Sequence, residues 1–378
     1  MRLTTEEMLS AKALWSEIFY EDSDVFTDYY FREKMQDNIG YGIKEDGKLV
    51  AMLYLTPYTG MLRMACGDSR QATEHFTKIP LFYIVGVGTK KEYRHRGFMD
   101  ALLRQALEDI REKGHPFTFL MPANPAIYTP YQFRYIYDRP EFLFAGQERL
   151  SISERISGVG RIPAQERMRA EEAEELAVFA EKQLKMRYQL FLHRDADYYI
   201  RQQKESQAQN GDVYIWKEEG KIKGFYLYAK EETEFIQEAL AEQGFERQMG
   251  IVVSQKKKPI IMARITDVCS MLTLIRLKQE ALQEAVAFEL EIKDELLSAN
   301  NGTFLWTVGK KESTIAMVEK TKETAVQISI ADLTEFLFGR KAAGECFVCP
   351  GEEGLPDALY ERLSWIDVIS HSFINEIV

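Results

Sequence analysis

Apolar residues in the first third of the chain recur with two different periods. Between residues 97 and 112 they fall on one face of a helix, at Met99, Leu102, Leu103, Ala106, Leu107 and Ile110. Strand-like runs at residues 81–89 and 117–121 flank this predicted helix. Earlier segments predict a helix over residues 5–20 and two strands over 41–43 and 49–56, joined by the turn Glu45-Asp46-Gly47. This order of elements is typical of an α/β unit.

Similar mixed patterns follow in the middle and last thirds of the chain. A Gly- and Pro-containing stretch at residues 158–163 predicts a linker, and the charged run at 254–259 predicts a solvated loop at a second boundary. The middle third predicts helices over 171–184 and 195–203 and strands over 213–217 and 224–229. The last third predicts strands over 260–265, 287–292, 302–310, 314–320 and 325–329 and helices over 268–278, 330–338 and 364–377. We expect three mixed α/β (α+β) units, residues 1–146, 147–258 and 259–378.

Composition narrows the class of partner. The chain has 378 residues and is 46% hydrophobic, so it can bury a sizeable core over two or three domains. It carries 48 Lys and Arg against 59 Asp and Glu, a formal net charge of −11. This balance disfavours nucleic acid and an anionic membrane surface as partners, and it favours a cationic small molecule.

The N-terminus, the apolar runs and the cysteines indicate the cellular compartment and whether a metal site is expected. The N-terminus is polar and acidic, and the apolar run at residues 79–88 is too short to cross a membrane. Four cysteines in a chain of this length do not make a disulfide framework, so we expect a cytoplasmic protein. Cys346-Phe347-Val348-Cys349 is one Cys-x-x-Cys pair without a second pair or a nearby histidine, and buried free thiols and no metal are expected there.

A basic turn stands where the strand over 81–89 leads into the helix over 97–112. Arg94, His95 and Arg96 crowd the helix start, where the free N–H groups and the helix dipole disfavour cations unless an anion binds among them. A phosphate held by N–H groups, with Gly97 allowing close approach of the backbone, explains this arrangement, and so does a solvated basic turn. The Walker pattern and the dinucleotide Gly-x-Gly-x-x-Gly pattern are both absent here.

Two further segments carry candidate chemistry. Tyr128 and Phe133 lie in a Tyr-rich segment after the strand over 117–121, where tyrosines also serve as packing residues. The C-terminus is apolar to its last residue, which favours packing inside the molecule over fraying. Packing would carry the α-carboxylate of Val378 inward, and burial would raise its pKa toward that of a proton acceptor for an amine. A final amphipathic helix that docks for stability alone is the alternative.

These segments resemble motifs of the GNAT acetyltransferase superfamily. Arg94-His95-Arg96-Gly97-Phe98-Met99 resembles its pyrophosphate loop, Gln/Arg-x-x-Gly-x-Gly/Ala, with Met99 where Gly or Ala is usual. Residues 128–133 are similar to the pattern Tyr-x-x-x-Gly-Phe, with Gln132 in place of the glycine. Together with the apolar C-terminus, they resemble the enhanced intracellular survival (Eis) family over the whole chain.

The resemblance implies a domain organisation and a mechanism. It implies a GNAT domain, a GNAT-like middle domain without a cofactor motif, and a C-terminal domain of sterol-carrier-protein type that opens with the strand at residues 261–268. It also implies a hexamer that uses acetyl-CoA without a metal, Val378 as the base through its carboxylate, and Tyr128 as the acid. Residues expected to bind the cofactor are Val87, Gly88, Thr89, Arg94, His95, Arg96, Gly97, Phe98, Met99 and Asn124.

The acceptor is expected to be a cationic amine, of an aminoglycoside-like molecule, another polyamine or a protein lysine. Acidic and aromatic residues are candidates to bind it through charge and cation–π contacts: Asp22, Asp24, Phe26, Tyr30 and Glu376. Such residues also form solvated faces over core aromatics. The alternative function is a non-catalytic protein that binds coenzyme A or a lipid through its sterol-carrier-like domain.

Overall fold

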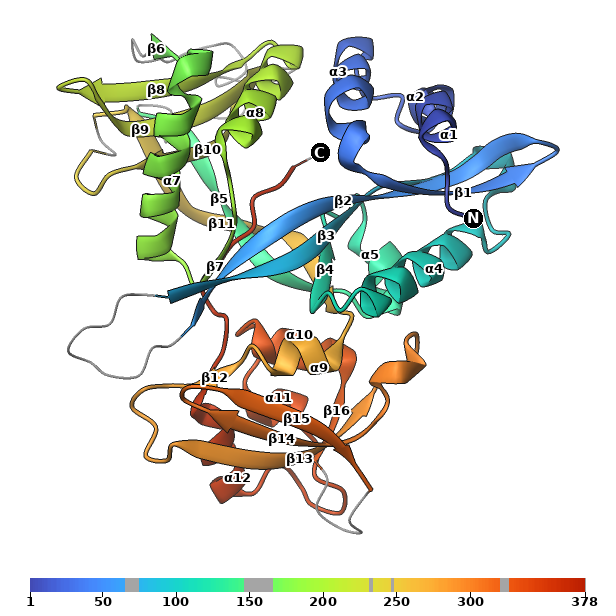
Figure 1. The fold of residues 1–378 in the computed structure, drawn as a ribbon, viewed down its shortest axis with the longest axis vertical. Coiled ribbons are helices and arrows are strands. Elements are labelled where there is room, and N and C mark those ends of the chain that lie inside the picture. Colours follow the sequence, from blue (N-terminus) through green and yellow to red (C-terminus); the bar gives the residue numbers. More distant parts are fainter. Residues whose placement is uncertain (65–74, 146–165, 231–233, 246–247, 320–325, 378) are drawn as a thin grey trace.

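The computed structural model describes residues 1–64, 75–145, 166–230, 234–245, 248–319 and 326–377. One large twisted sheet draws strands from all three parts of the chain (Figure 1). Its strand order is β18-β7-β2-β3-β4-β11-β5, and β1 pairs with β2 at the side. The strands are β1 (Ile39–Glu45), β2 (Lys48–Met64), β3 (His75–Thr89), β4 (Phe117–Leu120), β5 (Arg134–Phe144), β7 (Leu190–Leu192), β11 (Ile251–Ile265) and β18 (Ser372–Phe373).

The first unit follows the predicted order of elements. Asp46 and Gly47 have φ of 49° and 75°, which makes the predicted turn a tight hairpin between β1 and β2. The helices are α1 (Thr5–Ser10), α2 (Lys12–Ile18), α3 (Asp24–Tyr29), α4 (Phe98–Glu112) and α5 (Pro125–Tyr128). The helix predicted over residues 5–20 is thus two helices that meet at Ala11. The predicted apolar face of α4 is confirmed, because Leu103 and Leu107 are fully buried.

The middle unit has a sheet of its own. Its order is β10-β9-β8-β6, and α7 and α8 pack beside it. These elements are β6 (Glu166–Arg167), α7 (Ala173–Arg187), α8 (Ala196–Ala208), β8 (Asp212–Glu218), β9 (Lys221–Lys230) and β10 (Glu234–Ala241). Both predicted helices and both predicted strands are present. The predicted linker at residues 158–163 lies outside the described residues.

The C-terminal unit is a second small sheet with short helices. Its order is β15-β14-β13-β16, and β12 pairs with β17 separately. The strands are β12 (Arg276–Leu277), β13 (Ala285–Lys293), β14 (Gly302–Gly309), β15 (Ser313–Val318), β16 (Val326–Ser329) and β17 (Ile366–Asp367). The helices are α9 (Val268–Leu272), α10 (Ile330–Leu337), α11 (Ala343–Cys346) and α12 (Asp357–Ser364). Trp306 is fully buried and donates its indole N–H to the Leu272 carbonyl at 3.1 Å, which joins the sheet to α9.

The charged run at residues 254–259 is a strand, and the predicted loop was wrong. It belongs to β11, where Lys257 and Lys258 pair with Pro140 and Arg139 of β5. The lysines signalled solvent exposure, which an extended strand also provides. The same strand continues to Ile265 between β4 and β5, so residues 260–265 complete the large sheet rather than open the C-terminal unit. The boundary predicted between residues 258 and 259 therefore falls inside one strand.

The helix predicted over residues 364–377 was also wrong. Helix α12 ends at Ser364, and the chain beyond it is extended. Ser372 and Phe373 pair in parallel with Leu190 and Phe191 of β7, so the C-terminal segment becomes part of the large sheet. Its red trace runs beside β7 from the C-terminal unit toward the middle unit in Figure 1. Pairing with a neighbouring strand supplies hydrogen bonds that a helix would have made internally.

Candidate functional site

The edge of β3 opens where β3 and β4 part. The two strands pair only at Phe82 with Thr118 and at Tyr83 with Phe119, and β3 then continues to Thr89. Gly86 has φ of 60°, and a Cβ there would overlap the ring of Trp15, so only glycine fits this irregular point. Beyond it, Val87, Gly88 and Thr89 are partly exposed. Among the described strands, none pairs with this edge of β3 past Tyr83.

The start of α4 lies beside that open edge. Gly97 is the N-cap residue with φ of 79°, and no side chain caps the helix. The N–H groups of its first turn thus have no partner within the helix. A Cβ on Gly97 would meet no atom within 4 Å, so the space over this turn is open. His95 is also in the left-handed region, at φ of 62°, which curls the turn.

Two arginine side chains donate hydrogen bonds to backbone carbonyls near this turn. The Arg94 Nε donates to the Thr89 carbonyl at 3.2 Å. Arg96 donates to the Glu92 carbonyl at 3.2 Å, and its guanidinium lies 4.9 Å from the centre of the Tyr93 ring. Both arginines are exposed, so their charges remain available to a ligand at the start of α4.

A groove of about 500 Å³ runs along β3 to the start of α4. Eight of the ten predicted cofactor residues line it: Val87, Gly88, Thr89, Arg94, His95, Gly97, Phe98 and Met99. Arg96 and Asn124 do not line it. Asn124 instead caps α5, because its Oδ1 accepts the Ala126 N–H at 3.0 Å. The groove also contains residues that the sequence analysis missed: Ile18, Tyr93, Asp100, Ile127 and Tyr131.

Tyr128 ends α5 behind the wall of this groove. Its neighbours Ile127 and Tyr131 line the groove, whereas Tyr128 is buried against Phe133, with ring centres 6.1 Å apart. Burial raises the pKa of Tyr128 to about 12, so its hydroxyl keeps its proton at neutral pH. Burial is the main cause of the raised pKa of Tyr83 on β3, and Tyr128 is among the nearby groups that add to it. The predicted acid therefore belongs to the buried core and is not among the residues that line the groove.

Glu376 anchors the C-terminal segment. Its side chain is 1% exposed and accepts hydrogen bonds from the hydroxyls of Tyr58 and Tyr198, both at 2.9 Å. The Arg194 guanidinium lies 3.6 Å away. Burial raises the pKa of Glu376 even though Arg194 and Lys34 oppose this shift. Glu376 is therefore satisfied by the protein's own side chains, and Val378 lies outside the described residues.

A second cavity, of about 150 Å³, adjoins this anchor between the first and middle units. Tyr58 and Tyr198 line it together with His193 and with charged side chains of both signs: Lys34, Asp37, Asp195 and Arg201. Tyr58 also contacts Tyr83, with ring centres 6.3 Å apart. Tyr83 thus lies next to the tyrosine that holds the C-terminal segment.

The other predicted substrate residues lie apart from both cavities. Asp22 accepts the Trp15 indole N–H at 2.9 Å, and burial raises the pKa of its carboxyl. Asp24 is exposed at the start of α3. Phe26 and Tyr30 are core residues, and Tyr30 stacks on Trp15 with ring centres 4.6 Å apart. None of these four is among the residues that line the two cavities.

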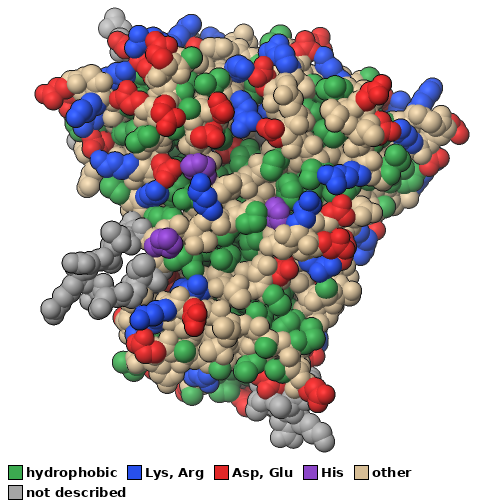
Figure 2. Space-filling model, viewed as in Figure 1, with side chains coloured by type: hydrophobic (Ala, Val, Ile, Leu, Met, Phe, Trp, Pro, Cys, Tyr) green, Lys and Arg blue, Asp and Glu red, His purple; other side chains and the backbone are tan. Residues whose placement is uncertain are grey.

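Potential metal ligands and thiols are the other groups of chemical interest among the described residues. Among the described residues, no group of three or more His, Cys, Asp or Glu side chains is arranged to hold a metal ion. Cys346 is a buried free thiol whose pKa burial raises to about 12, and Cys349 is a free, partly exposed thiol. Acidic and basic side chains are interspersed over the face in Figure 2. No helix in the described ranges is both long and apolar enough to cross a membrane.

Two family models match parts of the chain. The Acetyltransferase (GNAT) domain matches residues 1–136, which contain β1 to β4, the groove and Tyr128. The Sterol carrier protein domain matches residues 268–346, which begin just after β11. No curated protein matches the sequence.

Solved structures share the fold over the full chain. A probable N-acyltransferase of unknown function from Enterococcus faecalis V583 is 18% identical, with a TM-score of 0.74 over 100% of this chain and 99% of that one. A GCN5-related N-acetyltransferase from Anabaena variabilis is 15% identical, with a TM-score of 0.73 over 100% of both chains. Eis1 from Mycobacterium abscessus is 13% identical, with a TM-score of 0.68 over 99% of this chain and 98% of that one. These likenesses extend the expected fold to all three units.

Proposed function

Residues 1–136 are an acetyltransferase domain of the GNAT type, and from this premise we propose that the protein transfers the acetyl group of acetyl-CoA to an amine. The observation that supports this most directly is the groove along β3. It brings the open strand edge, the uncapped start of α4 and the Ile127–Tyr131 turn together in one place.

The residues of the groove fit acetyl-CoA. The first turn of α4, with the open space over Gly97, suits a pyrophosphate, and Arg94 and Arg96 add positive charge beside it. The backbone groups of Val87, Gly88 and Thr89 suit an amide-containing arm laid along the strand edge. When bound, acetyl-CoA supplies an acetyl group activated as a thioester.

The chain's own residues would then move the protons. An amine of pKa about 10 is protonated at neutral pH and must lose a proton before it attacks. We assign that proton to the α-carboxylate of Val378, which follows two residues after the anchored Glu376. Tyr128 Oη would donate a hydrogen bond to the departing sulfur. Because the pKa of Tyr128 is about 12 and that of a thiol is about 8.5, the tyrosine keeps its proton at equilibrium and acts mainly by stabilising the developing charge.

The acceptor would approach through the cavity beside Tyr58 and Tyr198. Asp37 and Asp195 line this cavity together with Lys34 and Arg201, so the lining itself favours neither sign of charge. The net negative charge of the whole chain supports a cationic amine of an aminoglycoside-like molecule, another polyamine or a protein lysine as the acceptor. Asp22, Asp24, Phe26 and Tyr30 lie outside that cavity and have at most an indirect part. A hexamer stays a prediction of the family resemblance, and a cytoplasmic location stays a prediction of the N-terminal sequence and the cysteine content.

Titration calorimetry and a thiol-release assay test the proposal together. We expect heat on titration of acetyl-CoA into the full chain, and release of free thiol when polyamines or aminoglycosides are added. Absence of binding would overturn the cofactor assignment. Binding without turnover on any amine, together with co-purified lipid, would favour the non-catalytic alternative.

Gly97→Ala is expected to weaken acetyl-CoA binding about tenfold. The left-handed backbone of Gly97 costs an alanine roughly 1 to 2 kcal/mol, and the new methyl group enters the groove where a phosphate would approach the backbone. Gly220→Ala is the matched control, because Gly220 has φ of 75° and equally open surroundings in the β8–β9 turn. Calorimetry should show weaker binding for Gly97→Ala alone. Equal affinities in the two variants would remove Gly97 from the binding site.

A further inference from the structure

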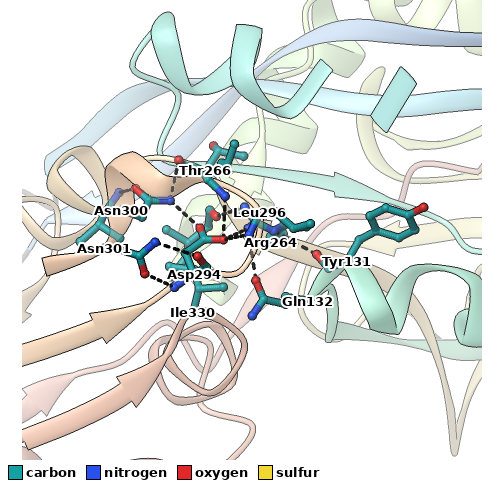
Figure 3. Close-up of polar contacts among 12 residues, drawn as sticks. Tyr131, Gln132, Arg264, Thr266, Asp294, Leu296, Asn300, Asn301 and Ile330 are labelled. Carbon is teal, nitrogen blue, oxygen red and sulfur yellow. Dashed lines mark hydrogen bonds and ion pairs between the residues drawn. The ribbon is translucent and has the colours of Figure 1, made fainter. Parts of the chain in front are cut away.

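A buried arginine joins the C-terminal unit to the turn that follows Tyr128. Arg264 is in β11, and Asp294 follows β13 in the C-terminal unit. Their side chains form an ion pair in which both are 0% exposed. Figure 3 shows Arg264 between Asp294 on one side and Tyr131 and Gln132 on the other.

The guanidinium is shared between the two sides. Its Nε donates to the Tyr131 carbonyl at 3.0 Å, and Nη2 donates to Gln132 Oε1 at 3.4 Å as well as to Asp294. Nη1 donates to the Ile265 carbonyl at 3.0 Å. A planar guanidinium with five donors in fixed directions can make all these bonds at once, whereas an ammonium group cannot.

Asp294 is itself held rigidly. Its Oδ1 accepts the N–H groups of Leu296 and Leu297 at 2.9 and 3.0 Å, and Oδ2 accepts the Asn300 side chain at 2.8 Å. Asn300 also donates to the Thr266 carbonyl at 3.1 Å, which returns the network to the chain just after β11 (Figure 3). The position of Arg264 is therefore set by the C-terminal unit.

Backbone hydrogen bonds connect Tyr128 to the turn that Arg264 holds. The Phe133 N–H donates to the Tyr128 carbonyl at 3.3 Å, and the Gln132 N–H donates to the Thr129 carbonyl at 2.9 Å. Gln132 has φ of 64°, a conformation that favours glycine, and yet it carries a side chain that accepts from Arg264. The glycine usual in the pattern Tyr-x-x-x-Gly-Phe has thus been replaced by a residue that ties the turn to Arg264.

We propose that Arg264 is a positioning residue, which holds the turn after Tyr128 in place and makes the alignment of the Tyr128 hydroxyl depend on the C-terminal unit. A fully buried ion pair is a costly way to gain stability, because apolar side chains of similar volume fill such a space as well or better. The ion pair also leaves Arg264 free to make directed hydrogen bonds to Tyr131 and Gln132, which apolar side chains could not make. This inference rests on the proposed role of Tyr128 as the donor to the leaving group.

Arg264→Lys is the primary test. Lysine keeps the buried charge opposite Asp294 but loses the forked contacts to the turn, so we expect kcat to fall about tenfold while the KM for acetyl-CoA stays within about twofold. In a Tyr128→Phe background, the same substitution should lower kcat less than about twofold further, because the group that it positions is already gone. If the lysine variant does not fold, Arg264→Met with Asp294→Asn removes both charges together and should give the same pattern.

Arg340→Gln is the matched control. Arg340 forms a two-point ion pair with Asp138 of β5, at 2.8 and 2.9 Å, and so joins the same C-terminal unit to the same sheet without touching the turn. Its kcat should stay within about twofold of the unmodified protein. An equal fall of kcat in Arg340→Gln would show that docking alone matters and would overturn the inference.

The remaining outcomes separate the inference from the proposed function. If Tyr128→Phe lowers kcat and Arg264→Lys does not, Arg264 has no positioning role and the proposed function stands. If both lower kcat independently, so that their effects multiply in the double variant, Arg264 does not act through Tyr128. If Tyr128→Phe leaves kcat unchanged, the donor assignment fails and the positioning of Tyr128 fails with it.

Discussion

Three residues appended after Val378 are expected to lower turnover at least about 100-fold while acetyl-CoA binding is kept. The extension replaces the α-carboxylate with a neutral peptide group, which cannot accept a proton from the amine, and it moves the new chain end by about 3.3 Å per residue. The cofactor groove lies on β3 and α4 and does not include the C-terminal segment, so calorimetry with acetyl-CoA should change little. Thiol release with a polyamine acceptor measures the loss.

A semisynthetic protein of unchanged length that ends in a carboxamide separates charge from bulk. It should be as inactive as the extended protein if the carboxylate is the base. The Tm of both variants should remain close to that of the unmodified protein, because Tyr58 and Tyr198 still hold Glu376. Normal turnover by the extended protein would show that Val378 is not the base.

Tyr128→Phe is expected to lower kcat about 100-fold with little change in the KM for acetyl-CoA. The variant removes only the hydroxyl group, and the groove wall is made by its neighbours Ile127 and Tyr131. Loss of one positioned donor to a developing negative charge typically costs a factor of this size. Steady-state kinetics at saturating acetyl-CoA gives the value.

Tyr226→Phe controls for the loss of a buried hydroxyl. Tyr226 lies in the middle unit, and its hydroxyl has no hydrogen-bond partner among the described residues, so this variant should keep full activity. The raised pKa of Tyr128, about 12, also predicts how kcat depends on pH. Since the hydroxyl stays protonated below that value, its ionisation should cause no fall of kcat between pH 7 and 10. A tenfold fall in this range that disappears in Tyr128→Phe would show that the pKa is much lower.

Local patterns predicted most of the elements. The Asp46-Gly47 turn, the apolar face of α4 and the strand before it could be predicted because each depends on residues that are close together in the sequence. Most residues that line the groove could be named for the same reason. Gly88, Gly97 and their neighbours form one stretch of sequence, and only Ile18, Ile127 and Tyr131 come from elsewhere in the chain.

Pairing between distant segments explains the failures. The lysines of β11 are polar at every position from 256 to 258, so they lack the alternation that marks a strand, and only β5 across from them makes the segment extended. Phe373 and its neighbours have an apolar pattern that suits a helix, and β7 decides otherwise. Arg264 and Asp294 stand 30 positions apart, and no local pattern indicates their pairing.

Glu376 shows a limit of a different kind. It was selected as a substrate residue because it lies beside the chain end, and the structure does place it near the cavity lined by Tyr58 and Tyr198. Its role there is to fix the segment, because two tyrosine hydroxyls and Arg194 occupy its carboxylate. Sequence position alone cannot distinguish a side chain that waits for a ligand from one that is already paired.

The place of β11 between β4 and β5 has a consequence for dissecting this protein. A fragment that stops near residue 146 would retain both of those strands and lack the one that separates them, which leaves two unpaired backbone edges over an apolar interior. Such a fragment would aggregate rather than serve as a minimal catalyst. The N-terminal portion emerging from a ribosome therefore stays incomplete until more than a hundred further residues have been made.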